Sequence, residues 1–545
     1  MMSKNKKTRE KNIFSSGIIL SFLTFLSRIL GLIREMTKAS LLGTSSLSDA
    51  FSFAFMLPNL FRRLFAENSV SVAFIPTFRS YLDNKDIEKK DTQTFISATL
   101  TMVSLFTVII VLLGILFAPV IVNVFSKPPS TDSITEAANS MSETILLTRI
   151  MFPYLFVISI AAVLQGILNA HNVFSPSGFT PILFNITVIL CSYLLSDLSG
   201  NPARAMAIGI MAGGIIQSLF QLPFVLKFGW KITFTGFKTA FTNPGTRRVL
   251  RLVAPTVLGM AAYQLNDLVS SVIAKNAGEG ILSSIQYSLR LQELILGVFA
   301  VTLGTIILPD MSSLAKAKKW AEYNRMLSKS LQIIALITIP ITFFSLTIGE
   351  NLIILLYKSN SFTDESVRLT ESAFMYHICG LFFIASNRIL APAFYAQGDA
   401  KSPTFAGIIG FGVNMVLAYV LSKTMKGSGI ALALSAASLI NTIGLFLFLR
   451  RKKSIDSSFV LKKTAAYALR ITILSLISAA PVYLLKSAIF SIFSDEGRLL
   501  GQGIPLFICG LIFASCGVFL LLLTKDPILA DMVQTVKNRL SKKTQ

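Results

Sequence analysis

The chain has 545 residues, of which 53% are hydrophobic and only 14% are charged, and its mean hydropathy is +0.67. Soluble domains carry about 25% charged residues, so this composition excludes a soluble globular protein and predicts a membrane protein made of many helices. The net charge of +23 does not indicate nucleic-acid binding. The basic residues cluster in short loops between hydrophobic segments, where they orient a membrane protein and contact anionic lipid headgroups.

Fourteen hydrophobic segments are predicted to cross the bilayer as helices, since a crossing needs about 20 mostly apolar residues. In chain order they are 14–37, 48–76, 95–125, 143–170, 178–197, 203–226, 249–274, 281–310, 328–357, 370–397, 403–422, 428–449, 465–487 and 501–524. The first does not read as a cleavable signal peptide, because an arginine-containing helix follows it instead of a small-residue cleavage site. The sequence therefore predicts an all-α polytopic membrane protein.

The loops between these segments alternate in charge, which predicts the orientation. Basic residues fill the N-terminus and every second loop: Lys4 to Lys11, Arg79 to Lys90, Lys227 to Arg251, Lys316 to Lys329, Arg450 to Lys463 and Lys525 to Lys543. The opposite loops carry acids, namely Asp132, Glu136, Asp364, Glu365, Asp495 and Glu496. Both termini are therefore expected in the cytoplasm, which agrees with an even number of spans.

Two short motifs recur six spans apart. Pro76 closes the second span and Pro309 the eighth, and a Ser-Pro helix start recurs at Pro176 and Pro403. A six-span displacement preserves orientation, so we expect two six-helix lobes that are parallel repeats, followed by two further helices. The predicted parts are a basic N-terminus at 1–13, an N-lobe at 14–226, a cytoplasmic linker at 227–248, a C-lobe at 249–449, spans 13 and 14 within 465–524, and a basic tail at 525–545.

Arginines inside the spans are the strongest functional signal. A charge at bilayer depth costs several kcal/mol, roughly 3 to above 10, so such residues face a watery cavity or a partner. Guanidinium groups bind phosphate through two parallel hydrogen bonds. Because they outnumber the nearby acids, these arginines predict a cavity for an anionic substrate. The candidates for binding a diphosphate are Arg28, Arg62, Arg63 and Arg290.

Further charged residues lie beside these arginines and are predicted to support the cavity. They are Arg34, Glu35, Asp49, Glu67, Glu293 and Arg388. The spacing of Arg63 with Glu67 and of Arg290 with Glu293 also fits a salt bridge along one helix, so a purely structural role stays open for these pairs. Pro58 is expected to kink the second span.

Other chemistries find little support in the sequence. No phosphate-binding GxxxxGK[ST] loop or HExxH motif is present, and two histidines do not make a metal centre. The four cysteines lie in apolar runs and are expected to pack as small hydrophobic residues. Asp267, in the middle of the seventh span, is a candidate for binding a coupling monovalent cation; otherwise no cofactor is expected.

The charged motifs resemble the MurJ (MviN) family of lipid II flippases, which lies within a larger superfamily of multidrug, oligosaccharidyl-lipid and polysaccharide exporters. The resemblance covers about residues 14 to 525 and is carried by Ser27-Arg28-Ile29-Leu30-Gly31-Leu32-Ile33-Arg34, Asp49-Ala50-Phe51, Leu57-Pro58-Asn59-Leu60-Phe61-Arg62-Arg63-Leu64-Phe65-Ala66-Glu67, Ala73-Phe74-Ile75-Pro76, Leu303-Gly304-Thr305-Ile306-Ile307-Leu308-Pro309 and Leu390-Ala391-Pro392-Ala393-Phe394-Tyr395.

This resemblance implies a central cationic cavity, a groove for the polyprenyl tail formed by spans 13 and 14, and transport of lipid II across the bacterial cytoplasmic membrane for peptidoglycan synthesis and cell shape. It also implies a possible sodium site, for which Asp267 and Asn414 match. Ala418 stands where a carboxylate is expected one turn after Asn414, which argues against sodium coupling. Lipid II, membrane lipids and cell-wall synthases are the implied partners.

Other functions compete with a lipid II flippase. A flippase for another polyprenyl-diphosphate oligosaccharide, or a multidrug exporter, shares the same expected architecture. An enzyme acting on polyprenyl phosphates is disfavoured, because such enzymes carry clustered aspartates or a His/Arg set in a loop. A non-transporting scaffold for synthases would leave the arginines inside the spans dispensable. The sequence thus favours a transporter.

Overall fold

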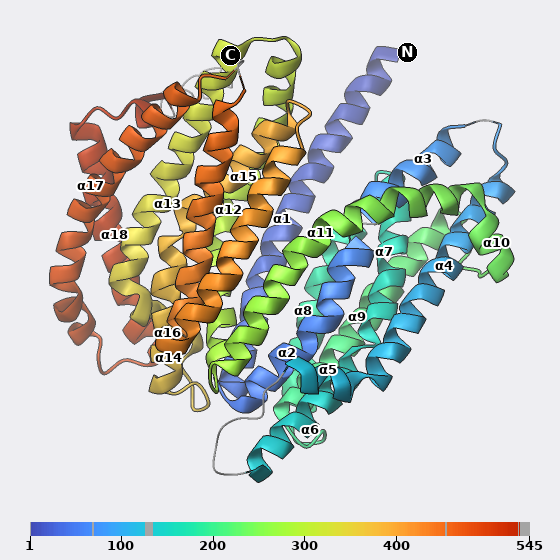
Figure 1. Cartoon of the computed structure of the whole chain (residues 1–545), viewed down its shortest axis with the longest axis horizontal. Helices are drawn as coiled ribbons and strands as arrows, with labels where there is room; N and C mark the ends of the chain where they lie inside the picture. The colour runs from blue at the N-terminus through green and yellow to red at the C-terminus, as the bar shows by residue number, and fades with distance from the viewer. Residues whose placement is uncertain are drawn as a thin grey trace. The chain divides into compact units, whose positions relative to one another are not determined.

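The computed structural model describes residues 2–67, 70–84, 86–125, 134–452, 455–531 and 534. Within these ranges, side chains are described except at 2–18, 21, 65–67, 70, 71, 134–138, 255, 256, 258–263, 298–306 and 308. Every regular element in the described ranges is helical (Figure 1). The predicted all-α class is therefore confirmed. By their internal contacts the residues form two compact units, Met1–Ser283 and Ser284–Gln545.

The first unit holds the helices up to α11, and α12 begins at its end. Its elements are α1 (Met2–Leu42), α2 (Ser46–Phe61), the π-helices η1 (Arg62–Glu67) and η2 (Val70–Phe74), α3 (Ile75–Asp83), α4 (Lys89–Leu116), α5 (Ala118–Phe125), α6 (Ile134–Met151), α7 (Tyr154–Ala170), α8 (Ser175–Leu194), α9 (Pro202–Lys227), α10 (Phe237–Thr242) and α11 (Pro244–Asn276). The elements that follow are α12 (Ile281–Lys316), α13 (Trp320–Tyr357), α14 (Asp364–Cys379), α15 (Leu381–Tyr395), α16 (Lys401–Arg450), α17 (Ser457–Ile492) and α18 (Arg498–Leu523).

Every predicted span coincides with one or more of these helices. By length and composition, eight helices in the described part are long and apolar enough to cross a membrane, and the bent pair α14–α15 makes a ninth. The chain is therefore a multi-pass membrane protein by composition, while the count of fourteen spans stays a prediction. Some predicted spans are divided between shorter helices, such as α4 with α5 and α6 with α7.

The second predicted span is broken where its arginines begin. α2 runs through Pro58 to Phe61, and the backbone N–H of Arg62 donates to the carbonyls of Pro58 and Asn59. The chain then continues as the π-helix η1. This change to a π-helix comes one turn after Pro58, and the kink expected at the proline stays a prediction. π-helical turns are uncommon and are frequent at functional sites, which draws attention to the two arginines that open η1.

α16 contains two of the predicted spans, joined by a sharp reversal. Lys426 has φ 48° and ψ −124°, which interrupts the helix. The rings of Phe405 and Phe448 lie 5.9 Å apart, although a straight helix would separate them by about 65 Å at a rise of 1.5 Å per residue. A Cβ on Gly429 would lie 2.4 Å from the carbonyl oxygen of Leu421. The two parts of α16, before and after Lys426, therefore approach closely only with a glycine at this position.

The loop before α11 is held against α4. Gln93 exchanges hydrogen bonds with the backbone of Lys231, its Nε2 donating over 2.7 Å and its Oε1 accepting over 2.9 Å. The backbone N–H of Thr235 donates to Thr101 Oγ1 at 2.8 Å. These bonds hold the loop within the first compact unit, which extends to Ser283. The predicted boundary between N-lobe and C-lobe at 249 was drawn from the repeat and stays a prediction.

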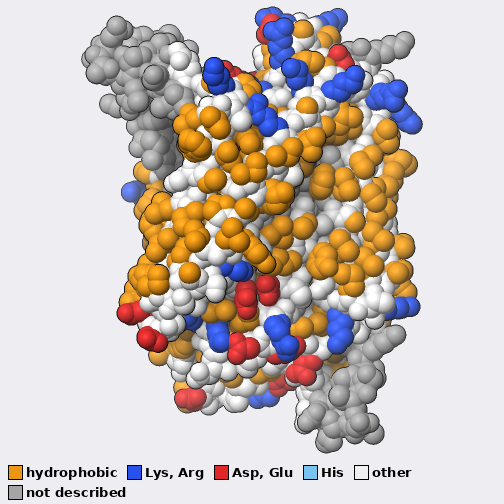
Figure 2. Space-filling model, turned by 90° about the vertical axis from the view of Figure 1, so that its left-hand side faces the viewer, with side chains coloured by type: hydrophobic (Ala, Val, Ile, Leu, Met, Phe, Trp, Pro, Cys, Tyr) orange, Lys and Arg blue, Asp and Glu red, His pale blue; other side chains and the backbone are white. Residues whose placement is uncertain are grey.

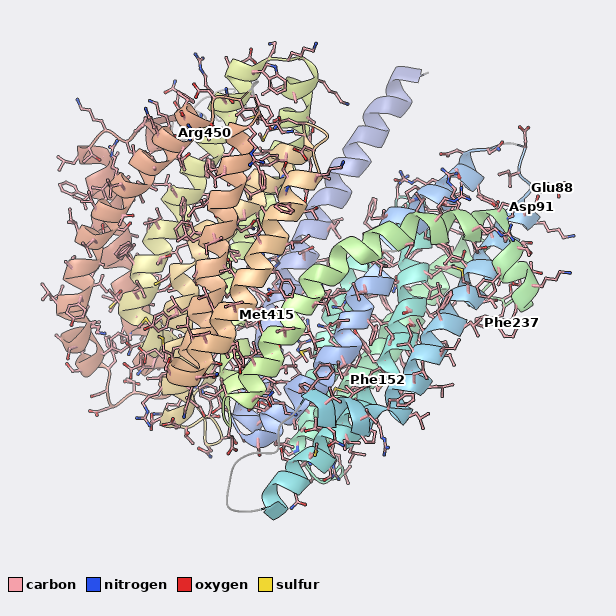
Figure 3. All side chains as sticks on the ribbon, viewed as in Figure 1. Glu88, Asp91, Phe152, Phe237, Met415 and Arg450 are labelled. Atoms are coloured by element: carbon pink, nitrogen blue, oxygen red, sulfur yellow. The ribbon has the colours of Figure 1, made fainter. Side chains whose placement is uncertain are left out.

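In the interior of the first unit, an aromatic ring packs closely against a glycine. Phe152, between α6 and α7, is 1% exposed and is labelled in Figure 3. A Cβ on Gly114 of α4 would lie only 2.0 Å from its ring, so α4 approaches this ring through a glycine.

His171 lies among aromatic side chains. Its ring is stacked on that of Phe228, with 4.4 Å between the ring centres, and it accepts a hydrogen bond from Trp230 Nε1 at 2.8 Å. Burial lowers the pKa of His171, which keeps its Nε2 free to accept that bond.

Both predicted Ser-Pro motifs begin helices. Pro176 lies in the first turn of α8, where its missing N–H is not needed. The second motif follows Asp399, whose carboxylate accepts from Ser402 N and Ser402 Oγ and pairs with Lys452 at 2.7 Å. Burial opposes ionisation of Asp399, but the bonds from Lys452 and Ser402 outweigh it and lower its pKa to about 2. Pro309 differs, because α12 continues past it to Lys316.

The last two helices pack on α13 and leave a wide apolar face. Ile348 of α13, Val482 of α17 and Cys509 of α18 belong to one buried cluster. Figure 2 faces this side of the chain and shows a broad hydrophobic band between charged groups at its two ends. Leu484 of α17 and Phe507 of α18 are 75% and 67% exposed. Such a face suits contact with lipid chains.

Candidate functional site

Arg28 lies in the middle of α1 and is half-buried. Among the described residues it forms no ion pair. The preceding residue, Ser27, accepts a hydrogen bond at its carbonyl from Asn185 Nδ2 of α8 at 3.3 Å. Gly31, one turn later, is buried. The first span is therefore anchored to α8 beside an arginine whose charge is not neutralised by a described carboxylate.

The next turns of α1 carry a chain of charged groups. Arg34 Nη2 pairs with Glu35 Oε1 at 2.8 Å, and its guanidinium lies 5.7 Å from the ring centre of Phe184. Arg34 therefore packs inside the first unit. Lys38 is 4% exposed, and its Nζ donates to Ser52 Oγ of α2 at 2.6 Å. Lys38 was not among the predicted site residues. Its position four residues after Arg34, on the same helix face, was the available signal.

Asp49 is buried near the start of α2 and joins two distant parts of the first unit. It is 5% exposed. Its Oδ2 accepts from the backbone N–H of Gly280 at 2.7 Å, and its Oδ1 accepts from that of Ser283 at 2.8 Å. A second hydrogen bond joins the same two segments but is exposed, because the backbone N–H of Ser46 donates to Glu279 Oε1 at 2.8 Å. Asp49 therefore has a structural task that its place in the sequence did not reveal.

The π-helix η1 presents Arg62 and Arg63 in different directions. Arg62 Nε donates to Asn59 Oδ1 at 3.0 Å. Arg63 Nη1 pairs with Asp267 Oδ2 of α11 at 3.3 Å, and the two side chains are 34% and 57% exposed. The predicted partner of Arg63 was Glu67, whose side chain lies outside the described residues. The observed ion pair thus comes from another helix, and it connects two residues that the sequence placed in separate candidate sites.

In the second unit, Arg290 and Glu293 form the salt bridge that their spacing allowed. Arg290 Nη1 lies 3.3 Å from Glu293 Oε2. The Nε atom of Arg290 is buried and has no hydrogen-bond partner in the described part of the chain. A buried donor without a partner costs about 1–3 kcal/mol. Arg290 therefore keeps a hydrogen-bonding capacity that the salt bridge does not use.

The remaining candidates lie in different surroundings. Arg388 of α15 is exposed, while its neighbour Asn387 bonds to Ser438 and Thr442 of α16. Asn414 is 2% exposed within α16. In the part of the chain that the structure describes, no group of three or more His, Cys, Asp or Glu residues is arranged to hold a metal. The ion pair with Arg63 also competes with any cation for Asp267.

Comparison with known proteins decides the family. The model of the lipid II flippase MurJ family matches residues 38–494. A probable lipid II flippase MurJ of Treponema pallidum (strain Nichols) is 42% identical over 532 residues, which are 97% of this chain and 99% of that protein. The chain belongs to the MurJ family. A second probable MurJ, from Vibrio cholerae, is 31% identical over 80% of this chain and 82% of its own length.

Solved structures agree with this assignment. A MurJ lipid II flippase in an inward closed conformation matches with a TM-score of 0.74 and 25% identity, over 92% of this chain and 99% of that one. An inward-facing multidrug resistance transporter of the MATE family, in the MOP superfamily, matches with a TM-score of 0.64 and 14% identity, over 82% and 99%. The second likeness shows only that the fold is shared. Together they confirm the MurJ and MATE transporter fold. With the MurJ relatives, they do not favour a flippase for another oligosaccharide or a multidrug exporter.

The arrangement has a clear chemical capacity. Among the candidate guanidinium groups, Arg63 pairs with Asp267 in the first unit and Arg290 pairs with Glu293 in the second. Both of those ion pairs are long, at 3.3 Å, and partly exposed. Exposed pairs contribute little, typically 0 to about 1 kcal/mol. A phosphate group can therefore exchange with these carboxylates at little cost.

Proposed function

We propose that this chain moves lipid II, the undecaprenyl-diphosphate-linked peptidoglycan precursor, from the inner to the outer leaflet of the bacterial cytoplasmic membrane. The observation that carries the proposal is membership of the MurJ family over residues 38–494, a range that includes η1 and α12. The chain would act as a transporter and not as an enzyme, since the arginines bind charge and supply no nucleophile or acid–base pair. Cell-wall synthases that consume the exported precursor are proposed partners.

In this proposal the diphosphate is bound by Arg28, Arg62, Arg63 and Arg290. Phosphate oxygens accept from guanidinium groups in pairs, and the buried Nε of Arg290 is one donor left for such a ligand. When the substrate leaves, Arg63 would form its ion pair with Asp267 again. The apolar outer face of α17 and α18 suits the polyprenyl chain.

Depletion of the protein tests this function. We expect lipid II to accumulate in the inner leaflet, because its synthesis continues while its export stops. The measurement is mass spectrometry of lipid-linked precursors, together with an enzymatic assay for precursor exposed on the outer surface. Accumulation of a different polyprenyl-linked sugar, with lipid II export unchanged, would contradict the proposal.

The proposed orientation places both termini in the cytoplasm, and cysteine labelling from outside intact cells tests it. The background variant replaces Cys191, Cys379, Cys509 and Cys516, which are all free thiols. New cysteines at the exposed positions Glu365 and Asp495 are expected to react, while those at Asp86 and Lys238 are protected. Lys238 is chosen in its segment because it is exposed, whereas Ala240 nearby is fully buried. The reverse labelling pattern contradicts the orientation.

We further propose that membrane potential, and not ATP, drives transport. The substrate is anionic, and a negative interior favours outward movement of negative charge by about 2.3 kcal/mol per charge at 100 mV. Exposure of lipid II should therefore fall when an ionophore collapses the voltage alone. If exposure survives that treatment but stops when only the sodium gradient is removed, Asp267 and Asn414 become the centre of a cation-coupled mechanism instead.

A further inference from the structure

A basic pocket lies within the second unit, and its lining includes none of the arginines discussed above. It has a volume of about 440 Å³ and opens where α13, α17 and the segment after α18 meet. Its lining combines charged, polar and apolar side chains: Arg325, Ser328, Lys329, Gln332, Phe459, Lys463, Ala466, Tyr467, Arg470, Pro527, Ile528 and Asp531. Tyr467 and Ile528 also belong to a buried cluster with Ile339 of α13, so the three walls are fixed to one another.

The wall after α18 is held by Asp526. Its side chain is buried, and its Oδ1 accepts from Tyr467 Oη at 3.1 Å and from the backbone N–H groups of Ile528 and Leu529 at 3.0 Å each. Arg470 lies 3.8 Å from the other carboxylate oxygen and donates to the carbonyl of Thr524 at 2.7 Å. Asp526 therefore fixes the segment after α18 to α17, and the contacts with Asp526 and Thr524 hold the side chain of Arg470 at the edge of the pocket.

The pocket carries more positive than negative charge. Lys329 pairs with Asp531 at 2.8 Å, but both side chains are at least half exposed. Arg325 and Lys463 are exposed and form no ion pair among the described residues. Four cationic side chains therefore face two carboxylates, one of which is buried in the wall. This balance favours an anion with several acceptor oxygens, such as a phosphate group.

The surface next to the pocket is apolar along a single helix face. Ile473, Ile477 and Leu484 follow Arg470 at three, seven and fourteen residues, so they share its side of α17. Their exposed fractions are 52%, 47% and 75%. Figure 2 shows the hydrophobic band on this side of the chain, with Lys and Arg at both ends of it and most of the visible Asp and Glu at one end. A ligand bound by the basic residues would thus have hydrocarbon-compatible surface beside it.

We propose that this pocket binds the phosphate headgroup of an anionic glycerophospholipid, whose acyl chains lie along α17. Basic pockets between membrane helices bind such headgroups on the cytoplasmic side, and the loops that flank this pocket are among those predicted to be cytoplasmic. Arg325 and Lys463 supply uncompensated charge, Arg470 marks the border with the acyl region, and the apolar wall covers the glycerol. The proposal does not depend on lipid II transport.

Binding to the purified full-length chain tests the proposal. The probes are dioctanoyl phosphatidylglycerol, dioctanoyl phosphatidylcholine and inorganic phosphate, added to delipidated protein in neutral detergent. Affinity is measured by native mass spectrometry and by the rise of the melting temperature with probe concentration. Phosphatidylglycerol is expected to bind at least tenfold more tightly than phosphatidylcholine, and inorganic phosphate at the same concentration is expected to have no effect.

Two double variants locate the site. Arg325→Ala with Lys463→Ala removes charge from the pocket and is expected to lower the affinity for phosphatidylglycerol at least tenfold. Lys316→Ala with Lys462→Ala is the matched control, since both lysines are exposed and lie outside the lining, and Lys462 is the immediate neighbour of Lys463. Equal affinity in the two double variants would overturn the site. Equally tight binding of inorganic phosphate, lost in the pocket variant, would overturn the lipid assignment.

Discussion

Replacement of Arg28, Arg62 and Arg290 by alanine should abolish growth of a strain that depends on this protein, while membrane insertion stays normal. Each hydrogen bond to a charged group contributes about 1.5–3 kcal/mol, and a tenfold change in affinity corresponds to about 1.4 kcal/mol. Each single substitution is therefore expected to weaken substrate binding by roughly ten- to a hundredfold. The measurement is complementation of a depleted strain, with membrane levels determined by immunoblot.

Arg→Lys at the same three positions should restore growth only in part, because lysine keeps the charge but loses the two-pronged donor geometry. Arg368→Ala is the matched control. Arg368 is an arginine of the second unit whose side chain is 76% exposed and pairs with Glu365 at the surface. It should tolerate the change fully. Normal growth of the triple alanine variant would refute binding of the diphosphate by these arginines.

Asp49→Ala is expected to cause the second large loss, in stability as well as in growth. It leaves the buried N–H groups of Gly280 and Ser283 without their acceptor, and each such group costs about 1–3 kcal/mol. Asp49→Asn keeps a single acceptor oxygen, so we expect an intermediate effect. The measurement is the melting temperature of the purified protein in detergent, together with complementation.

Glu279→Ala provides the comparison for Asp49. Glu279 also accepts a backbone hydrogen bond, from Ser46, at 2.8 Å, but this contact is exposed. Water can replace it, so the melting temperature should change little. If Asp49→Ala and Glu279→Ala lowered the melting temperature equally, burial of Asp49 would not be the reason for its effect.

The arginines proposed to bind phosphate and the buried Asp49 are expected to affect different properties, namely substrate binding and stability. The arginines act through charge that is only partly neutralised, and their substitution should leave the melting temperature unchanged. Asp49 acts through two short bonds to backbone groups more than 200 residues away along the chain. Measuring growth and stability on the same variants therefore separates a binding role from a structural role.

The sequence by itself determined the class of protein, the approximate helix positions and the candidate arginines. Hydrophobic length sets a span whatever its neighbours are, because the bilayer fixes the number of residues needed. Pro176 and Pro403 marked helix starts correctly, since the conformation of proline is a local property. The charges at Arg28, Arg62 and Arg290 were visible for the same reason, as departures from an apolar background.

Only the tertiary structure decided which charged groups meet. The spacing of Arg63 fits a pair with Glu67, whose side chain lies outside the described residues, and the structure shows a contact of Arg63 with Asp267 of another helix. Arg34 packs against Glu35 and Phe184. The buried contacts of Lys38 and Asp49 were likewise not predicted. An ion pair or a buried hydrogen bond depends on distances between helices far apart in the chain, and periodicity along one helix does not contain that information. Local chemistry therefore showed where charge lies, and the packing of helices decided what each charge contacts.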